Sequence, residues 1–166
     1  MSKTCLECGD KTIYITILFL LSNLYFLNAQ NVAEHFKTKQ FEVAIFPESS
    51  DEIMPGKRFT PTKEEIINAE NALKSKLKEV NRNFENQYNL PIIHRNLKKY
   101  KRQYFGFIND KGEKILYINS LWKKNEEENK WLQQIIMVSD GGSHYWNIEY
   151  NLNTDELMNL SVNGSA

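Results

Sequence analysis

The sequence predicts an α+β domain, a two-layer sandwich with one long helix packed on an antiparallel meander sheet. Three observations support this fold class. Apolar side chains recur at helical spacing over residues 66–84, a short alternating run precedes them at 41–46, and most of the chain after Tyr100 has the pattern of strands and turns. The composition, with 41% hydrophobic and 12% aromatic residues, is that of a folded domain rather than a disordered chain.

The first 29 residues have the layout of a secretory signal peptide. Lys3 and Lys11 precede an uncharged apolar stretch at 12–29, which ends on the small residue Ala29. An uncleaved membrane anchor is the alternative, because about 20 apolar residues can span a bilayer. We expect cleavage near Ala29 and an exported mature protein, either periplasmic or secreted.

Residues 30–166 are expected to form a single domain without disulfides, since Cys5 and Cys8 both precede the cut. A chain of this size can be stabilised by its core alone. Lys plus Arg and Asp plus Glu each total 21, and the removed segment carries two charges of each sign. This neutral balance argues against nucleic acid or an anionic membrane as a general partner.

The domain opens with a strand and then the helix. Residues 41–46 place the apolar Phe41, Val43 and Ile45 on one side, as a short strand does. Two helix starts fit the sequence that follows. Thr60 can cap a helix with Pro61 in its first position, or Thr62 can cap it with Glu65 completing a capping box.

The apolar stripe of the helix predicts its length and its partner. It extends over about six turns, with charged residues on the other faces, and comprises Ile66, Ala69, Leu73, Leu77, Val80 and Phe84. Burying its five larger side chains contributes on the order of 10 kcal/mol, at about 1.5–3 kcal/mol each. The helix should therefore lie against the sheet formed by the rest of the chain.

Four or five consecutive strands are predicted after the helix. Residues 103–108 and 114–121 form a hairpin, because Gly112 in the linking Asn109-Asp-Lys-Gly112 can adopt the positive φ of a bulged loop. A wholly polar loop at 123–130 leads to a third strand at 131–138. Two more strands follow, and the first of them has the clearest alternation in the chain.

The final two strands each have one apolar face. In the first, at 144–152, the apolar face comprises His144, Trp146, Ile148, Tyr150 and Leu152, and the other face is polar. After a turn at 153–155, the last strand places Met158, Leu160 and Val162 on a shared face.

This order of elements resembles the cystatin-like fold, which hosts protease inhibitors, enzymes and exported domains. Cystatin inhibitors insert a Gln-x-Val-x-Gly hairpin loop and a Pro-Trp loop into a protease cleft. Here the hairpin loop is Asn109-Asp-Lys-Gly112 and there is no Pro-Trp pair. The inhibitory residues therefore do not carry over.

A second resemblance covers the chain from Tyr100 onward. Tyr100-Lys-Arg-Gln-Tyr104 with Gly106, Asp140-Gly-Gly with Tyr145, and the terminal Val162-Asn-Gly164 resemble a family of small uncharacterised exported bacterial proteins. The resemblance implies export and a compact domain, and it supplies no activity.

A basic segment lies at the start of the predicted hairpin. Its five cations fall within eight residues, with no acid between them, and are Arg95, Lys98, Lys99, Lys101 and Arg102. With Tyr100 among them, they could bind a polyanion with salt-sensitive affinity. We favour the alternative of a solvated strand edge, where lysines discourage pairing with other chains.

The turn Asp140-Gly-Gly-Ser143 and the two residues after it bring a carboxylate, a hydroxyl and an imidazole together in the sequence. Successive residues of a strand point to opposite faces, so Ser143 and His144 are not expected to act together. Asp and Gly also suit a sharp reversal, which is the interpretation we favour. The alternative is a small hydrolase or lyase with a pocket near His144, Asp140 and Tyr145.

No metal or cofactor site is predicted. His35, His94 and His144 are far apart in the sequence, and Cys5 with Cys8 supplies only half of a zinc site.

We expect an exported, non-catalytic binding or interaction domain whose ligand is a protein, peptide or glycan. The sheet face away from the helix should be open, and Tyr145 on it could stack a ligand, although such rings more often serve the core. The predicted binding surface joins the basic segment to His144 and Tyr145. The two alternatives are the small hydrolase or lyase and a polyanion-binding protein acting through Arg95–Arg102.

Overall fold

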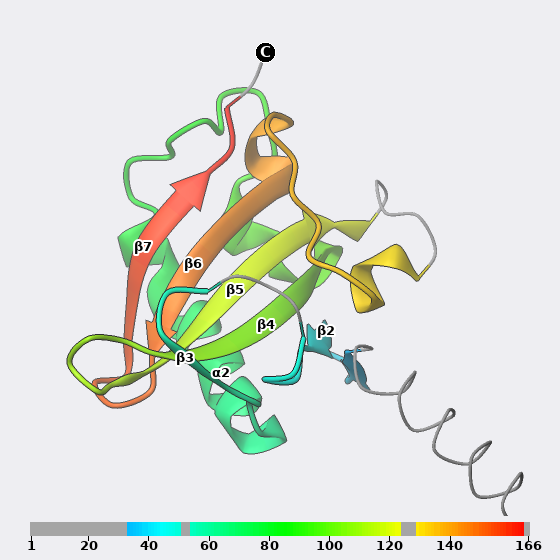
Figure 1. Ribbon diagram of the computed structural model, residues 1–166. Helices are drawn as coiled ribbons and strands as arrows, with labels where there is room; N and C mark the ends of the chain where they lie inside the picture. The colour runs from blue at the N-terminus through cyan, green and yellow to red at the C-terminus, as the bar shows by residue number, and fades with distance from the viewer. Residues whose placement is uncertain (1–32, 51–53, 124–128, 165–166) are drawn as a thin grey trace, which may run out of the picture. The chain divides into compact units, whose positions relative to one another are not determined.

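The computed structural model describes residues 33–50, 54–123 and 129–164 (Figure 1). The predicted signal peptide, Cys5 and Cys8 lie outside the described residues. The elements are β1 (Glu34–Lys37), β2 (Glu42–Ile45), β3 (Lys57–Phe59), α2 (Lys63–Val80), η1 (Ile93–Arg95), η2 (Leu97–Lys99), β4 (Tyr100–Ile108), β5 (Lys114–Trp122), η4 (Lys130–Leu132), η5 (Gly142–His144), β6 (Tyr145–Asn151) and β7 (Glu156–Val162).

The strands form one seven-stranded sheet in the order β1-β2-β4-β5-β6-β7, with β3 also paired to β4. Strands β4 to β7 make the predicted antiparallel meander. The pairing of β2 with β4 is parallel, which the sequence analysis did not predict. Parallel neighbours need a long crossover, and here it runs through β3 and α2. The α+β class is confirmed, and the sheet is mostly antiparallel.

Helix α2 begins where one of the two predicted caps places it. Thr62 is the N-cap, and its Oγ1 accepts a hydrogen bond from the Glu65 backbone N–H at 3.2 Å. The Glu65 carboxylate in return accepts from the Thr62 N–H at 2.9 Å, which completes the capping box. The alternative start at Thr60 is therefore wrong.

The helix ends earlier than its apolar stripe predicts. It stops at Val80, and Phe84 lies beyond it with a φ of 51° and 44% of its surface exposed. The side chain of Asn81, the C-cap residue, exchanges two hydrogen bonds with the side chain of Gln87. This buried amide pair turns the chain away from the helix axis, so the prediction that Val80 and Phe84 extend the buried stripe is wrong.

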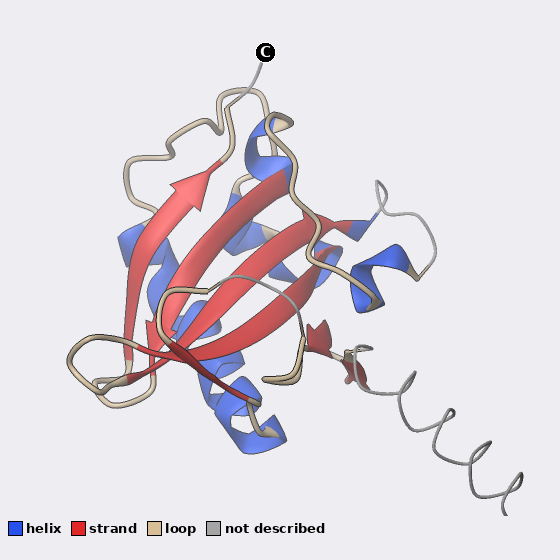
Figure 2. Ribbon diagram, in the orientation of Figure 1, coloured by secondary structure: helices blue, strands red, loops and turns tan. Residues whose placement is uncertain are grey.

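The remaining stripe residues form the core with the sheet, as predicted. Helix α2 covers one face of the sheet (Figure 2). The helix side chains and their sheet partners are buried together, among them Ile66, Ala69, Leu73, Leu77, Val43, Ile45, Tyr104, Ile118, Trp146 and Ile148.

The predicted strand at 131–138 is wrong. These residues form the 3₁₀ turn η4 and an irregular connection that crosses the face of the sheet opposite α2 (Figure 2). Strand β5 already pairs directly with β6, so there is no room for a strand between them. The connection instead forms hydrogen bonds with side chains of the sheet.

Two buried amides hold this connection. Gln103 Nε2 donates to the carbonyls of Trp131 and Gln134 at 2.8 and 2.7 Å. Its Oε1 accepts from the backbone N–H of Ile136 and from the side chain of Asn119, both at 2.9 Å. Gln103 and Asn119 face each other across β4 and β5, so they act as one unit.

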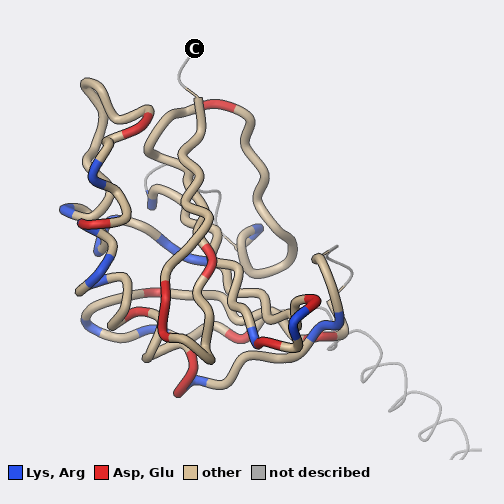
Figure 3. The backbone as a smooth tube through the Cα atoms, turned by 90° about the vertical axis from the view of Figure 1, so that its left-hand side faces the viewer, with Lys and Arg blue, Asp and Glu red and all other residues tan. Residues whose placement is uncertain are grey.

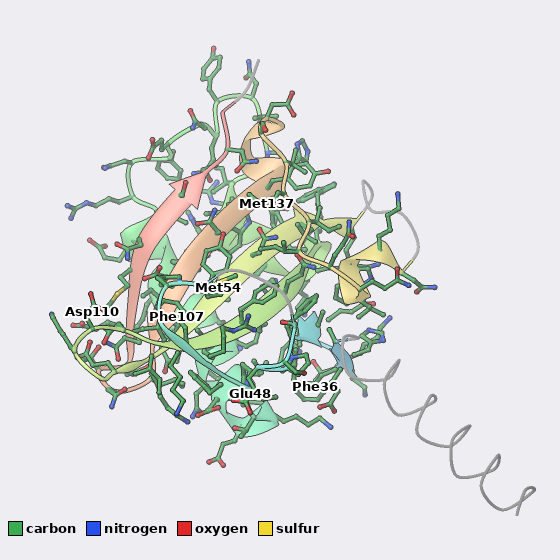
Figure 4. The ribbon with its side chains drawn as sticks, in the orientation of Figure 1. Phe36, Glu48, Met54, Phe107, Asp110 and Met137 are labelled. Carbon is green, nitrogen blue, oxygen red and sulfur yellow. The ribbon has the colours of Figure 1, made fainter. Side chains whose placement is uncertain are left out.

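The sheet face away from α2 is consequently not open along its length, contrary to prediction. Ala44, Phe46, Phe105, Leu121 and Trp131 form a second buried cluster there. Partly buried side chains from two connections also pack on it. Met54 and Met137, from these two connections, lie over this face in Figure 4.

Strand β7 departs from simple alternation. Its pairing with β6 shifts at Asn147 and Glu149, and Asn159 has a positive φ of 54°. This bulge turns Leu157 and Leu160 toward the core cluster, together with Val162. The prediction that Met158 shares their face is wrong, because the extra residue changes the period.

We predict that Glu65→Gln lowers the free energy of unfolding by about 0.5–1 kcal/mol near neutral pH. Burial acts to raise the pKa of Glu65, but its bonds to Lys114 and Thr62 more than offset this and hold the pKa below its ordinary 4.5. Its stabilising contribution is therefore present above that value and is lost as the pH falls through the lowered pKa. Urea unfolding at several pH values tests this.

Glu64→Gln is the matched control, because Glu64 is an exposed first-turn carboxylate beside Glu65. The deficit of Glu65→Gln relative to this control should shrink as the pH falls through the lowered pKa of Glu65 and vanish below it. A deficit that is the same at acid and neutral pH would contradict the account.

Candidate functional site

The five cations of the predicted basic segment lie in three different places in the structure. Arg95 in η1 and Lys98 and Lys99 in η2 are exposed, whereas Arg102 is 1% exposed and faces α2. Lys101 faces the opposite side of the sheet, where its ammonium lies 4.7 Å from the centre of the Trp131 ring. Strand β4 has neighbours on both sides, so the favoured interpretation of these lysines as a strand edge is wrong.

A cleft of about 500 Å³ lies beside α2 and brings part of this segment together with other elements. Its walls come from α2, from the turn between β1 and β2, and from η1 and η2. Glu70 and Arg102 are at its base, and Phe41 and Leu97 contribute apolar surface. Cavities of this size are typical of small-molecule sites.

Glu70 and Arg102 form a bidentate buried ion pair. Arg102 Nε donates to Glu70 Oε1 at 2.6 Å, and Nη2 donates to Oε2 at 2.8 Å. The Tyr104 hydroxyl also donates to Glu70 Oε1 at 2.8 Å, and Arg102 Nη1 donates to the Leu97 carbonyl at 2.8 Å. One carboxylate and one guanidinium thus join α2, β4 and η2.

The pair fixes the charge state of its members. Burial acts to lower the pKa of Arg102, but the charge of Glu70 outweighs it and raises that pKa. Burial, and after it the charge of Glu70, raises the pKa of Tyr104 well above its usual value. Arg102 therefore stays charged and Tyr104 keeps its proton, so neither titrates near neutral pH.

Cations without partners surround the cleft. Lys74, Arg95 and Lys98 form no ion pair with any of the described carboxylates, and Lys99 lies 5.6 Å from the centre of the Trp122 ring. Elsewhere on the helix side, positive and negative residues are interspersed (Figure 3). Since Glu70 is already paired with Arg102, the unpaired cations give the cleft a positive potential.

His94 lines the cleft, and its tautomer follows from a chain of hydrogen bonds. The Ile93 backbone N–H donates to Gln87 Oε1 at 3.0 Å, which fixes the orientation of that amide. Gln87 Nε2 must then donate to Asn81 Oδ1, at 2.6 Å. Asn81 Nδ2 is left to donate to His94 Nδ1, at 3.1 Å. The neutral imidazole therefore carries its proton on Nε2.

His94 remains neutral at physiological pH. Burial, with the charges of Arg95 and Lys78 added, holds the pKa of His94 below its ordinary 6.5. The Nε2–H group has no partner among the described residues, so it is available as a hydrogen-bond donor at the cleft.

The other predicted site residues lie outside the cleft. His144 is in η5, with its Nδ1 3.0 Å from the Gly141 carbonyl oxygen and its ring 5.2 Å from that of Trp122. Tyr145 packs against the cluster on the opposite face, and Asp140 is exposed. The structure does not bring these three side chains to one cavity.

The glycine-rich segment before His144 is a turn, as predicted. Gly141 and Gly142 have φ values of 89° and 55°. A side chain at Gly142 would also collide with Leu90, since an added Cβ would lie 2.2 Å from its Cδ1. The positive φ of Gly142 therefore favours glycine, and a side chain there would require Leu90 to move.

Sequence reasoning missed Glu70 and His94, although Glu70 left a signal. It lies four residues after Ile66 and three before Leu73, within the apolar stripe of α2. A carboxylate at such a position needs a buried cationic partner. The partner lies 32 residues away, so nothing in the local pattern identifies Arg102.

Over 33–50, 54–123 and 129–164, no three His, Cys, Asp or Glu residues are grouped as metal ligands would be. The helices within these same ranges are too short or too polar to cross a bilayer.

No family model matches the chain, and no curated protein or solved structure is significantly similar to it. The geometry and charge of the cleft are therefore the features from which a function can be inferred.

We predict that Glu70→Gln costs about 3–5 kcal/mol of unfolding free energy, because it leaves the buried Arg102 cation unpaired. Replacing both residues, as Glu70→Leu with Arg102→Met, should recover much of this loss. Denaturant unfolding measures both.

Glu79→Gln is the control, because the 3.4 Å pair of Glu79 with Arg82 is exposed. It should change the stability by less than about 0.5 kcal/mol. If Glu70→Gln lowers the unfolding free energy by no more than this control does, the buried ion pair does not exist in solution.

Proposed function

We propose that the domain is a non-catalytic binding module that holds an anionic ligand in the cleft beside α2. The observation that carries this proposal is the set of unpaired cations, Lys74, Arg95 and Lys98, around a cavity of about 500 Å³. Cations without carboxylate partners destabilise the fold little when they lie on an open surface. In a concave site their electrostatic fields add and attract an anion.

The cleft is also preorganised. Its base is the buried pair of Glu70 and Arg102, and the bond from Arg102 to the Leu97 carbonyl holds η2 in place. A site fixed before binding loses little conformational entropy when the ligand enters. Lys98 and Arg95 flank this fixed point, so the chain segment that carries them is anchored.

The basic segment is better placed to bind a short anion than a long polyanion. A long polyanion would use the whole segment Arg95–Arg102, whereas Arg102 is buried and Lys101 lies over Trp131 on the other side of the sheet. Three cations remain from that segment, and Lys74 of α2 joins them at the cleft. The geometry favours a short anion within the cleft over a polymer along the surface.

Export and fold likeness are parts of the same proposal. The apolar stretch at 12–29 would direct the protein out of the cytoplasm, so the ligand would be met in the periplasm or beyond. The packing of α2 on the four-stranded meander supports a cystatin-like arrangement. The parallel β2–β4 pair and the hairpin loop give no support for insertion into a protease cleft.

We expect pyrophosphate, as a small anionic probe, to shift the amide resonances of the exported protein at residues 70–74 and 93–99, with an affinity that falls as salt is added. Arg95→Gln with Lys98→Gln should weaken binding about tenfold or more, since two charge-assisted contacts are lost. Two-dimensional NMR titration measures both effects.

Lys57→Gln with Lys111→Gln is the matched control, because it removes two exposed cations far from the cleft. It should leave the affinity within about twofold of wild type. An equal loss in both double variants, or shifts that map elsewhere, would refute the cleft as the anion site.

A further inference from the structure

The cleft offers apolar surface as well as charge. Phe41 and Leu97 line it, and both are only partly buried where they pack against the main core. The hydrocarbon stems of Lys74 and Lys98 add apolar surface beneath their ammonium groups. A purely ionic ligand would leave this surface wet, so the lining fits a ligand with an apolar body.

His94, which lines the cleft, also contacts Phe84, which does not line it. The two rings are 5.9 Å apart, and Phe84 is 44% exposed. Phe84 has a positive φ of 51°, a backbone state that bulky residues rarely adopt. The hydrogen bonds between Asn81 and Gln87 hold the loop in this state, with the Phe84 ring beside that of His94.

The polar groups are suited to one end of such a ligand. The Nε2–H of His94 is a neutral donor whose tautomer is fixed by Asn81. Arg95 follows it directly in the chain, and Lys74 faces the cleft from α2. A neutral donor beside cations is a suitable environment for an anionic headgroup.

We propose that the ligand of the cleft is an anionic amphiphile, in which a headgroup such as a carboxylate is joined to an unbranched hydrocarbon chain. The headgroup lies by His94, Arg95 and Lys74, and the chain lies along Leu97 and Phe41. This inference rests on the proposed function and deepens it, because it adds an apolar body to the anion.

Three soluble probes separate the two contributions in NMR titrations of the exported protein. Octanoate has both a charge and a chain, acetate has the charge alone, and 1-octanol has the chain alone. Octanoate should bind at the cleft at least about tenfold more tightly than either of the others, since each buried methylene and the headgroup contribute.

Two variants assign the contributions to residues. Leu97→Gln should abolish the preference for octanoate over acetate while leaving pyrophosphate binding within about twofold. Arg95→Gln should weaken octanoate binding and leave 1-octanol binding unchanged. Ile67→Gln is the matched control, because Ile67 is an apolar residue of α2 that is 43% exposed and does not line the cleft.

The outcomes distinguish this inference from the proposed function. If octanoate binds no better than acetate while pyrophosphate still binds at the cleft, the amphiphile is wrong and the anion site stands. If none of the anions shifts residues of the cleft, both are wrong. If octanoate and 1-octanol bind equally, the site is apolar and the anionic headgroup is overturned.

Discussion

The ion pair between Glu70 and Arg102 is the interaction on which the candidate site depends. It joins the middle of α2 to the beginning of β4, and through the Leu97 carbonyl it also fixes η2. Both charges are almost fully removed from water, so the pair is costly unless its geometry is held. The hydrogen bonds from Tyr104 and to Leu97 meet this requirement and set the position of the cleft wall.

A second polar unit determines which surface remains for binding. The amides of Gln103 and Asn119 fasten the connection after β5 to the sheet face opposite α2. That face becomes a second hydrophobic layer with Trp131 and Phe105, so the broad binding platform expected from the meander is largely covered. The cleft of about 500 Å³ lies instead at the border between the helix and the sheet, where η1 and η2 approach α2.

Periodicity predicted the elements that alternate regularly, and long-range contacts determined the rest. The capping box at Thr62, the hairpin at Gly112 and the buried face of β6 are local features, and the structure confirms them. The end of α2 depends on the pairing of Asn81 with Gln87, and the missing strand at 131–138 depends on Gln103. The cleft could not be predicted because Arg102 meets Glu70 only after the sheet has formed, although Glu70 within an apolar stripe was a visible anomaly.

The buried ion pair is tested most directly by the exchange rates of the arginine side-chain Nε–H groups, measured by NMR. The Nε–H of Arg102 should exchange slowly, because it donates to a buried carboxylate, and that of Arg82, which is exposed, should exchange rapidly. An Arg102 Nε–H that exchanges as fast as that of Arg82 would contradict the buried pair, since the guanidinium would then be in water and the cleft would lack its base.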